Sequence, residues 1–155
     1  MADFFRRIVV PPDFSASAER AWCLAQRLAR ALGAELVLVH VIRRAAWSTA
    51  RAAQSAEGAG KWAADELEDS AGKARAQGLR TRVALRTGVP HQEIAALVRE
   101  ENADLLVLAT RGGGAVSRRV LGDVASQLLR LAPCPVIMVP DVATPEAPGR
   151  HPAAD

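Results

Sequence analysis

The sequence predicts a single α/β domain, a doubly wound and mainly parallel five-stranded sheet with helices on both faces. Three observations predict this fold class: the length of the chain, short apolar runs that are continuous rather than alternating, and helical periodicity between those runs. At 155 residues, 50% of them hydrophobic and 24% charged, the chain can bury one core and has the composition of an ordinary globular protein. The resulting element order, βαβαβαβαβ, suits parallel strands joined by right-handed crossovers.

Five apolar runs predict the strands. They occupy residues 8–10, 36–42, 83–85, 105–109 and 136–139. Each run is too short for a typical helix, and most are apolar at consecutive positions, so both faces of these strands should be buried. We therefore expect helices to cover the sheet on each side.

Four segments of helical periodicity separate the strands. They are found near residues 17–32, 63–74, 94–98 and 124–132. Gly78 predicts the end of the second helix, Pro90 the start of the third and Pro133 the end of the fourth. The connection at residues 43–61 is unusually long, so we expect part of it to be an early turn of the second helix and part a mobile flap.

Composition and charge also indicate the extent of the domain and the cellular compartment. We expect the domain to span residues 1–140 and the proline-containing tail, residues 141–155, to be disordered. No apolar stretch reaches the ~20 residues that cross a bilayer, and the start lacks the apolar core of a signal peptide, which favours a cytoplasmic protein with no membrane partner. The net charge of +3 is scattered and does not favour nucleic acid. Cys23 and Cys134 lack metal or redox spacing, and we expect both to be small buried hydrophobic residues.

A glycine-rich segment follows the fourth predicted strand and leads into the fourth helix. Arg111, Gly112 and Gly113 begin it. Glycine lets the backbone approach a ligand closely, and the free N–H groups at a helix start favour an anion such as phosphate. Ligands of doubly wound sheets bind at the carboxyl ends of the strands, where the strand order reverses. A glycine run by itself also fits a flexible turn, so the two interpretations stay open at this point.

The surrounding residues resemble the universal stress protein family. Its C-terminal signature resembles Ala109-Thr110-Arg111-Gly112, nine residues, Gly122-Asp123, and then Pro133-Cys134-Pro135-Val136. The resemblance extends to residues 8–15 and 38–41 and covers about residues 5–140. It implies an adenine-nucleotide alpha-hydrolase-like fold, a regulatory role in the stress response, and ATP or another adenine nucleotide as ligand, with Mg²⁺ as a companion of the nucleotide.

The resemblance also implies a set of site residues. Asp13 matches the position that contacts adenosine, Val41 the one whose backbone faces adenine, and Gly112 and Gly122 two glycines of the phosphate loop. The expected cofactor-binding residues are Asp13, Val41, Ala109, Arg111, Gly112, Gly113, Gly122 and Asp123. Asp13 has an alternative role, capping the first helix together with Ser15 or Ser17.

Two positions depart from the family pattern. Ala109 stands where the first glycine is usual, and Asp123 stands where Ser or Thr would offer a hydroxyl to a phosphate. A carboxylate about 4 Å from a phosphate oxygen costs on the order of 4 kcal/mol at an effective dielectric near 20. Asp123 is also a good N-cap for the fourth helix. Mg²⁺ could bridge it to phosphates, while Arg111, Arg118 and Arg119 could offset part of its charge. ATP, a shorter adenine nucleotide and no nucleotide therefore remain alternatives.

No catalytic centre is evident in the sequence. A nucleophile with its base, a metal cluster and a Walker-type phosphate motif are all missing, and His40 within an apolar strand is expected to be a core histidine. We expect a regulatory binding module rather than an enzyme. The alternatives are a slow Mg²⁺-dependent ATP-hydrolysing enzyme that uses Asp123 and a ligand-free dimeric interaction scaffold. A homodimer is expected through the last strand, since the family commonly pairs it across a two-fold axis; its residues are Val136, Ile137, Met138 and Val139.

Overall fold

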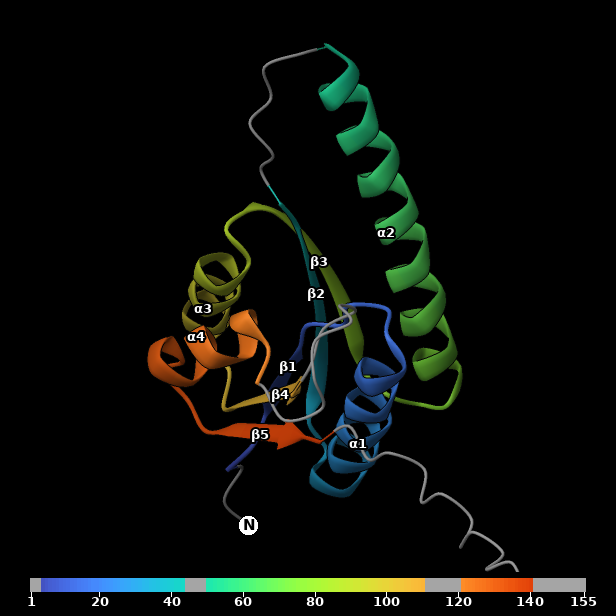
Figure 1. The fold of residues 1–155 in the computed structure, drawn as a ribbon. Coiled ribbons are helices and arrows are strands. Elements are labelled where there is room, and N and C mark those ends of the chain that lie inside the picture. Colours follow the sequence, from blue (N-terminus) through green and yellow to red (C-terminus); the bar gives the residue numbers. More distant parts are fainter. Residues whose placement is uncertain (1–3, 44–49, 111–120, 141–155) are drawn as a thin grey trace, which may run out of the picture.

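The computed structural model describes residues 4–43, 50–110 and 121–140, and it confirms the predicted fold class. Nine elements follow in the order β1 Arg7–Val10, α1 Ala16–Leu32, β2 Glu35–Arg43, α2 Ala50–Ala76, β3 Thr81–Gly88, α3 Pro90–Glu100, β4 Leu105–Ala109, α4 Asp123–Leu131 and β5 Val136–Val139. The strands form one parallel sheet in the order β3-β2-β1-β4-β5 (Figure 1). The strand order therefore reverses between β1 and β4.

Each face of the sheet has its own hydrophobic core. On one face Ile8 and Leu38 pack with Trp22 of α1 and Leu67 of α2. On the other face, Val9 and its neighbours pack with residues of α3 and α4, including Ile94 and Leu128. Successive strand residues point to opposite faces, so continuous apolar runs are what a sheet covered on both sides requires.

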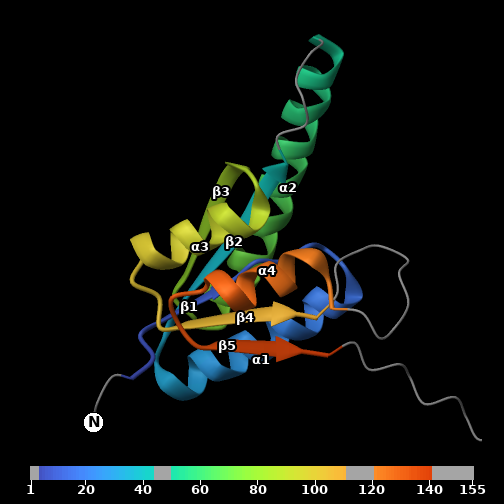
Figure 2. The same cartoon turned by 60° about the vertical axis from the view of Figure 1, so that its left-hand side comes forward.

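The two edge strands differ from the interior ones. β3 is longer than its apolar run at residues 83–85, because it pairs with β2 along eight residues, from Thr81 to Gly88. β5 pairs with β4 on one side and lies at the border of the sheet (Figure 2). Pairing with β2 thus sets the length of β3, and the apolar residues of β3 alone do not show that length.

The helix ends follow the expected signals. Ser15 caps α1 by accepting a hydrogen bond from the Ala18 N–H at 3.2 Å, and α1 ends at Gly33, whose φ is 68°. Pro90 begins α3 as expected. α2 begins at Ala50, so the expected early turn of the second helix is confirmed and extends over residues 50–61. Residues 44–49, the other part of this connection, lie outside the described ranges. The tail at residues 141–155 also lies outside them.

The expectation for the cysteines is wrong in part. Cys23 is exposed on α1, whereas Cys134 is half-buried and its burial raises the pKa of its thiol. The helical periodicity of α1 places its buried face on Ala21, Trp22 and Ala25 instead. Across the described part of the chain, no helix is both long and apolar enough to span a membrane.

Candidate functional site

At the carboxyl edge of the sheet the central strand stops before its neighbours, and we call the stretch beyond it, where β2 and β4 have no β1 partner, the opening. β1 ends at Val10, which pairs with Leu38, whereas β2 continues to Arg43 and β4 to Ala109. The cause is in the sequence, because the next two residues, Pro11 and Pro12, have no N–H group to donate to a neighbouring strand. The opening coincides with the reversal of strand order, where doubly wound folds hold their ligands.

Val41 presents its backbone to this opening. The Glu35 N–H donates to the Arg6 carbonyl on the β1 side, and the Leu36 N–H donates to the Arg80 carbonyl on the β3 side. Backbone groups alternate along a strand, so the odd-numbered residues of β2 face β1. The N–H and carbonyl of Val41 therefore point into the space beyond β1, while its side chain is buried against the α3 and α4 face.

Ala109 presents its backbone from the opposite side. The Thr110 N–H donates to the Val139 carbonyl of β5, so the preceding residue, Ala109, turns its backbone groups toward β1. The Gly122 N–H donates to the Thr110 carbonyl at 2.8 Å, which brings the start of α4 against the end of β4. Gly122, and with it the first residue of α4, Asp123, is therefore close to the end of β4, which Ala109 forms.

Asp13 lies on the turn between β1 and α1. Its Oδ1 accepts hydrogen bonds from the Ser15 N–H, at 3.0 Å, and from the Ser15 hydroxyl. Ser15 in turn caps α1. Asp13 is therefore not the cap itself, but it orients Ser15, which is. Asp13 is exposed, and it follows the end of β1 by three residues.

The expectation that Asp123 caps α4 is wrong. Gly122 is the N-cap, Asp123 is the first helical residue, and no side chain makes a capping hydrogen bond at this end. Asp123 is exposed, and a carboxylate in the first turn is favoured by the helix dipole without occupying its N–H groups. The donors at the start of α4 are therefore not consumed by this side chain.

An aromatic cluster beside the opening was not predicted. The ring of Phe14 lies 5.1 Å from that of His40 and 4.7 Å from that of Trp62, between centroids. Phe14 has a φ of 63°, a left-handed conformation that is uncommon for a bulky residue. His40 is half-buried, and burial lowers its pKa against the opposing effects of a hydrogen bond with the Pro12 backbone and the charge of Asp13. The cluster supports the turn that carries Asp13, and only a contact between residues distant in sequence could have revealed it.

Arg111, Gly112 and Gly113 lie outside the described residues, as do Arg118 and Arg119. Among residues 4–43, 50–110 and 121–140, no three His, Cys, Asp or Glu side chains are grouped so that they could hold a metal ion. The candidate site consists of backbone groups and single carboxylates, which suits binding through hydrogen bonds.

Comparison with known proteins gives one consistent result. The universal stress protein family model matches residues 4–140. A universal stress protein of Thermus aquaticus is 32% identical over 149 residues, which cover 87% of this chain and 98% of that protein. The structure of universal stress protein UspA from Lactobacillus plantarum is similar with a TM-score of 0.79 at 23% identity, covering 87% of this chain and 97% of that one. A universal stress protein solved in complex with cAMP is 26% identical, with a TM-score of 0.66 and coverage of 87% and 97%.

Proposed function

The chain belongs to the universal stress protein family, and on that premise we propose that it is a cytoplasmic stress-response regulator that binds an adenine nucleotide at the carboxyl edge of its sheet. The observation that carries this proposal is the opening past β1, into which the backbones of Val41 and Ala109 both point. The relative in complex with cAMP supports an adenine nucleotide as the ligand.

Each part of an adenine nucleotide has a counterpart among these residues. The Val41 N–H and carbonyl form one donor and one acceptor, which match the hydrogen-bonding edge of adenine. The Asp13 carboxylate is suited to accept hydrogen bonds from ribose hydroxyls. The N–H groups at the start of α4, beside Gly122, favour the phosphate.

Asp123 determines which nucleotide fits. Its exposed carboxylate stands at the first position of α4, next to the donors that a phosphate would use. A triphosphate brings more negative charge near Asp123 than a monophosphate does, so the repulsion grows with the length of the phosphate chain. We therefore propose that AMP or cAMP binds more tightly than ATP when Mg²⁺ is absent, and that Mg²⁺ reduces the difference by bridging Asp123 to the phosphates.

Calorimetry with AMP, cAMP and ATP, each with and without Mg²⁺, tests the proposal. Asp123→Ser should strengthen Mg²⁺-free ATP binding about tenfold, a modest value because solvent screens an exposed charge. Asp65→Ser, which removes an equally exposed carboxylate from α2, is the matched control and should leave affinity unchanged. Absence of binding by all three nucleotides would overturn the proposal.

Binding rather than catalysis is the role we propose. Slow hydrolysis of ATP through a Mg²⁺ ion on Asp123 predicts phosphate release that rises with protein concentration and is lost in Asp123→Ala. If that result is obtained, the regulator is also an enzyme. If phosphate release is the same in both proteins, Asp123 does not support hydrolysis.

We also propose that β5 pairs with a second copy of the chain. The carbonyls of Pro135 and Val139 face β4, so Val136 and Met138 direct their backbone groups away from the sheet. An open apolar edge of this kind favours strand pairing. Met138→Pro removes an outward N–H while sparing the bonds to β4, and should convert a dimer into a monomer in light scattering; a monomeric parent protein at micromolar concentration would contradict the pairing.

A further inference from the structure

The turn between β1 and α1 is held to β2 and α2 by contacts of Phe14 and Pro12. Phe14 directly follows Asp13. Its ring lies 5.1 Å from the ring of His40 on β2 and 4.7 Å from the ring of Trp62 on α2, between centroids. His40 also forms a hydrogen bond with the Pro12 backbone, and since proline has no N–H, the imidazole donates to the Pro12 carbonyl. His40 therefore contacts the residues on both sides of Asp13.

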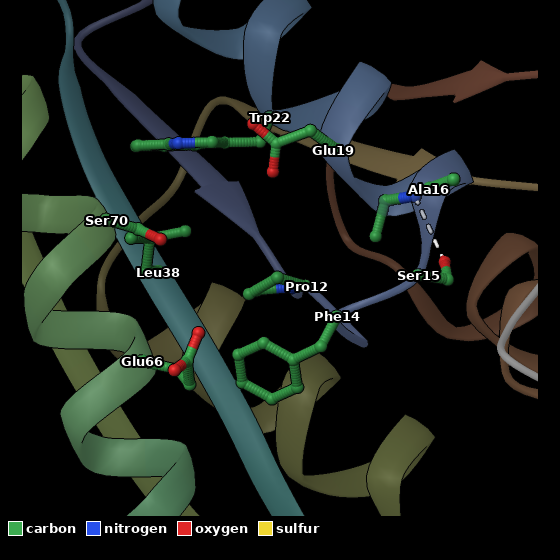
Figure 3. A pocket seen from close by; sticks show the side chains of 10 residues that line it. Pro12, Phe14, Ser15, Ala16, Glu19, Trp22, Leu38, Glu66 and Ser70 are labelled. Carbon is green, nitrogen blue, oxygen red and sulfur yellow. Dashed lines mark hydrogen bonds between the residues drawn. The ribbon is translucent and has the colours of Figure 1, made fainter.

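The backbone of Phe14 needs these contacts. Its φ of 63° is left-handed, a conformation that a bulky residue keeps only where its surroundings impose it, and such residues concentrate at ligand sites. On one side the turn has open space, because Pro12, Phe14 and Ser15 line a pocket of about 300 Å³ between α1 and α2 (Figure 3). The ring of Phe14 points from the turn toward β2 and α2, so the rings of His40 and Trp62 support the conformation of the turn (Figure 3).

His40 places this turn relative to the adenine end of the proposed site. It immediately precedes Val41 on β2, and successive side chains of a strand point to opposite faces. The Val41 side chain packs on the face of α3 and α4, so the His40 side chain lies on the face of α1 and α2, where Phe14 also packs. One strand thus carries both the backbone proposed for adenine and the ring that holds the turn of Asp13.

The imidazole leaves acceptor positions of the Asp13 carboxylate available. Burial lowers the pKa of His40 below its usual 6.5, although the hydrogen bond with Pro12 and the charge of Asp13 act in the opposite sense. The ring is therefore largely neutral at pH 7, and a neutral ring forms no ion pair with Asp13. Oδ1 of Asp13 accepts two hydrogen bonds from Ser15, which leaves lone pairs of the carboxylate for ribose hydroxyls.

We propose that His40 is a positioning residue of the nucleotide site, which holds the β1–α1 turn so that Asp13 meets the ribose hydroxyls of a nucleotide whose adenine lies at Val41. The inference rests on the proposed nucleotide-binding function. His40 acts through the turn and does not touch the nucleotide, so its loss should remove only the affinity that the ribose hydroxyls contribute.

Calorimetry at neutral pH with AMP and 2′,3′-dideoxy-AMP tests the proposal, because the second nucleotide lacks the hydroxyls that Asp13 would bind. The parent protein should bind AMP about tenfold more tightly than dideoxy-AMP. His40→Leu retains an apolar contact with Phe14 but donates no hydrogen bond to Pro12. It should weaken AMP binding about tenfold and leave the affinity for dideoxy-AMP unchanged.

Conservative variants separate the hydrogen bond from the packing of the ring. His40→Asn and His40→Gln present an amide N–H in place of one or the other ring nitrogen, so one of them should restore the preference for AMP. Asp13→Ala should remove that preference, and His40→Leu should then have no further effect, since the two residues act on the same contact.

Val83→Ala is the matched control. Val83 is a half-buried residue of β3 that packs on the same core, so its truncation should lower stability while the preference for AMP persists. Urea unfolding establishes that each variant is folded.

Four results would overturn the positioning role while the nucleotide site stands. They are a retained AMP preference in His40→Leu, an equal loss of both nucleotides in that variant when folded, failure of both amide variants to restore the preference, and loss of the preference in Val83→Ala. Absence of AMP binding to the parent protein would instead overturn the proposed function itself, and the role of His40 with it.

Discussion

The two edges of the sheet are built in opposite ways. At the amino edge, where the strands begin, Arg7 and Arg82 both pair with Glu35, at 3.0 and 2.7 Å, and both also pair with Glu101, at 3.4 and 2.6 Å. Asp104 accepts hydrogen bonds from the backbone N–H groups of two neighbouring residues at the start of β1. At the carboxyl edge, two prolines stop β1, and backbone groups of the strands on either side point into an opening.

The contrast also shows in the titration of the two edges. Hydrogen bonds from Arg82 are the largest cause that lowers the pKa of Glu35 and of Glu101. His40, near the carboxyl edge, has a lowered pKa mainly because burial disfavours its charged form. At the amino edge, arginine and glutamate side chains stabilise each other's charges. At the carboxyl edge, backbone N–H and carbonyl groups beyond β1 have no strand to pair with in the described part of the chain. Ion pairs hold the strand ends together at the amino edge, whereas the carboxyl edge is where we propose that the ligand binds.

The largest effect that tests this contrast is expected from Glu35→Gln. Glu35 is 17% exposed and bonds two arginines, so loss of its charge should lower the free energy of unfolding by about 2 kcal/mol. Nucleotide affinity should not change. Urea unfolding measures the first quantity and calorimetry the second, with Glu57→Gln as an exposed control expected to stay within about 0.5 kcal/mol of the parent. A loss of affinity in Glu35→Gln would break the contrast.

A smaller loss of stability is expected from Ser15→Ala at the other edge. The substitution removes the cap of α1, which should lower the free energy of unfolding by about 1 kcal/mol. It also frees the Asp13 carboxylate from its hydrogen bond with the Ser15 hydroxyl, so nucleotide binding should weaken as well. Measured in the same two assays, Ser15→Ala should affect both stability and binding, and an effect on stability alone would exclude Asp13 from the site.

The smallest effects are expected in the pH dependence of stability. The lowered pKa of His40 means that the unfolded chain takes up a proton first as the pH falls below 6.5, so the stability that the neutral imidazole contributes is lost from that point down. The pKa values of Glu35 and Glu101 are lowered because the fold stabilises their ionised forms. The stability that these two carboxylates contribute is therefore lost as the pH falls below 4.5.

Urea unfolding between pH 8 and about pH 2 should therefore resolve two windows. His40→Gln should flatten the upper window, and Glu35→Gln should flatten part of the lower one. If the pH dependence of the free energy of unfolding near pH 6 is the same in His40→Gln, the burial of this histidine has no effect on stability. The two edges then do not titrate in separate pH windows.

The architecture could be predicted because its signals are local. Continuous apolar runs and helical periodicity identified all five strands and the four helices, and Pro90 marked the start of α3. An early part of α2 was expected within residues 43–61, but its extent was not, because residues 50–61 carry helix-forming alanines without a clear apolar stripe. The length of β3 depends on pairing with β2, which its own residues do not announce.

The site was less predictable because it depends on distant contacts. The resemblance indicated Val41 as a site residue, but the direction of its backbone needed the sheet register. The four partners of the amino edge are separated by up to 94 residues, so no spacing could have revealed them. Asp123 was a reasonable cap by residue type, yet Gly122 takes that position because its N–H is bonded to Thr110.

Chemical shifts of the backbone amides, followed by NMR while AMP is added to the ¹⁵N-labelled protein, test the contrast between the edges most directly. We expect shifts at Val41, Ala109 and Gly122, at the carboxyl edge, and none at Glu35 or Arg82, at the amino edge. Shifts centred on the amino edge, or no shifts at saturating AMP, would contradict it.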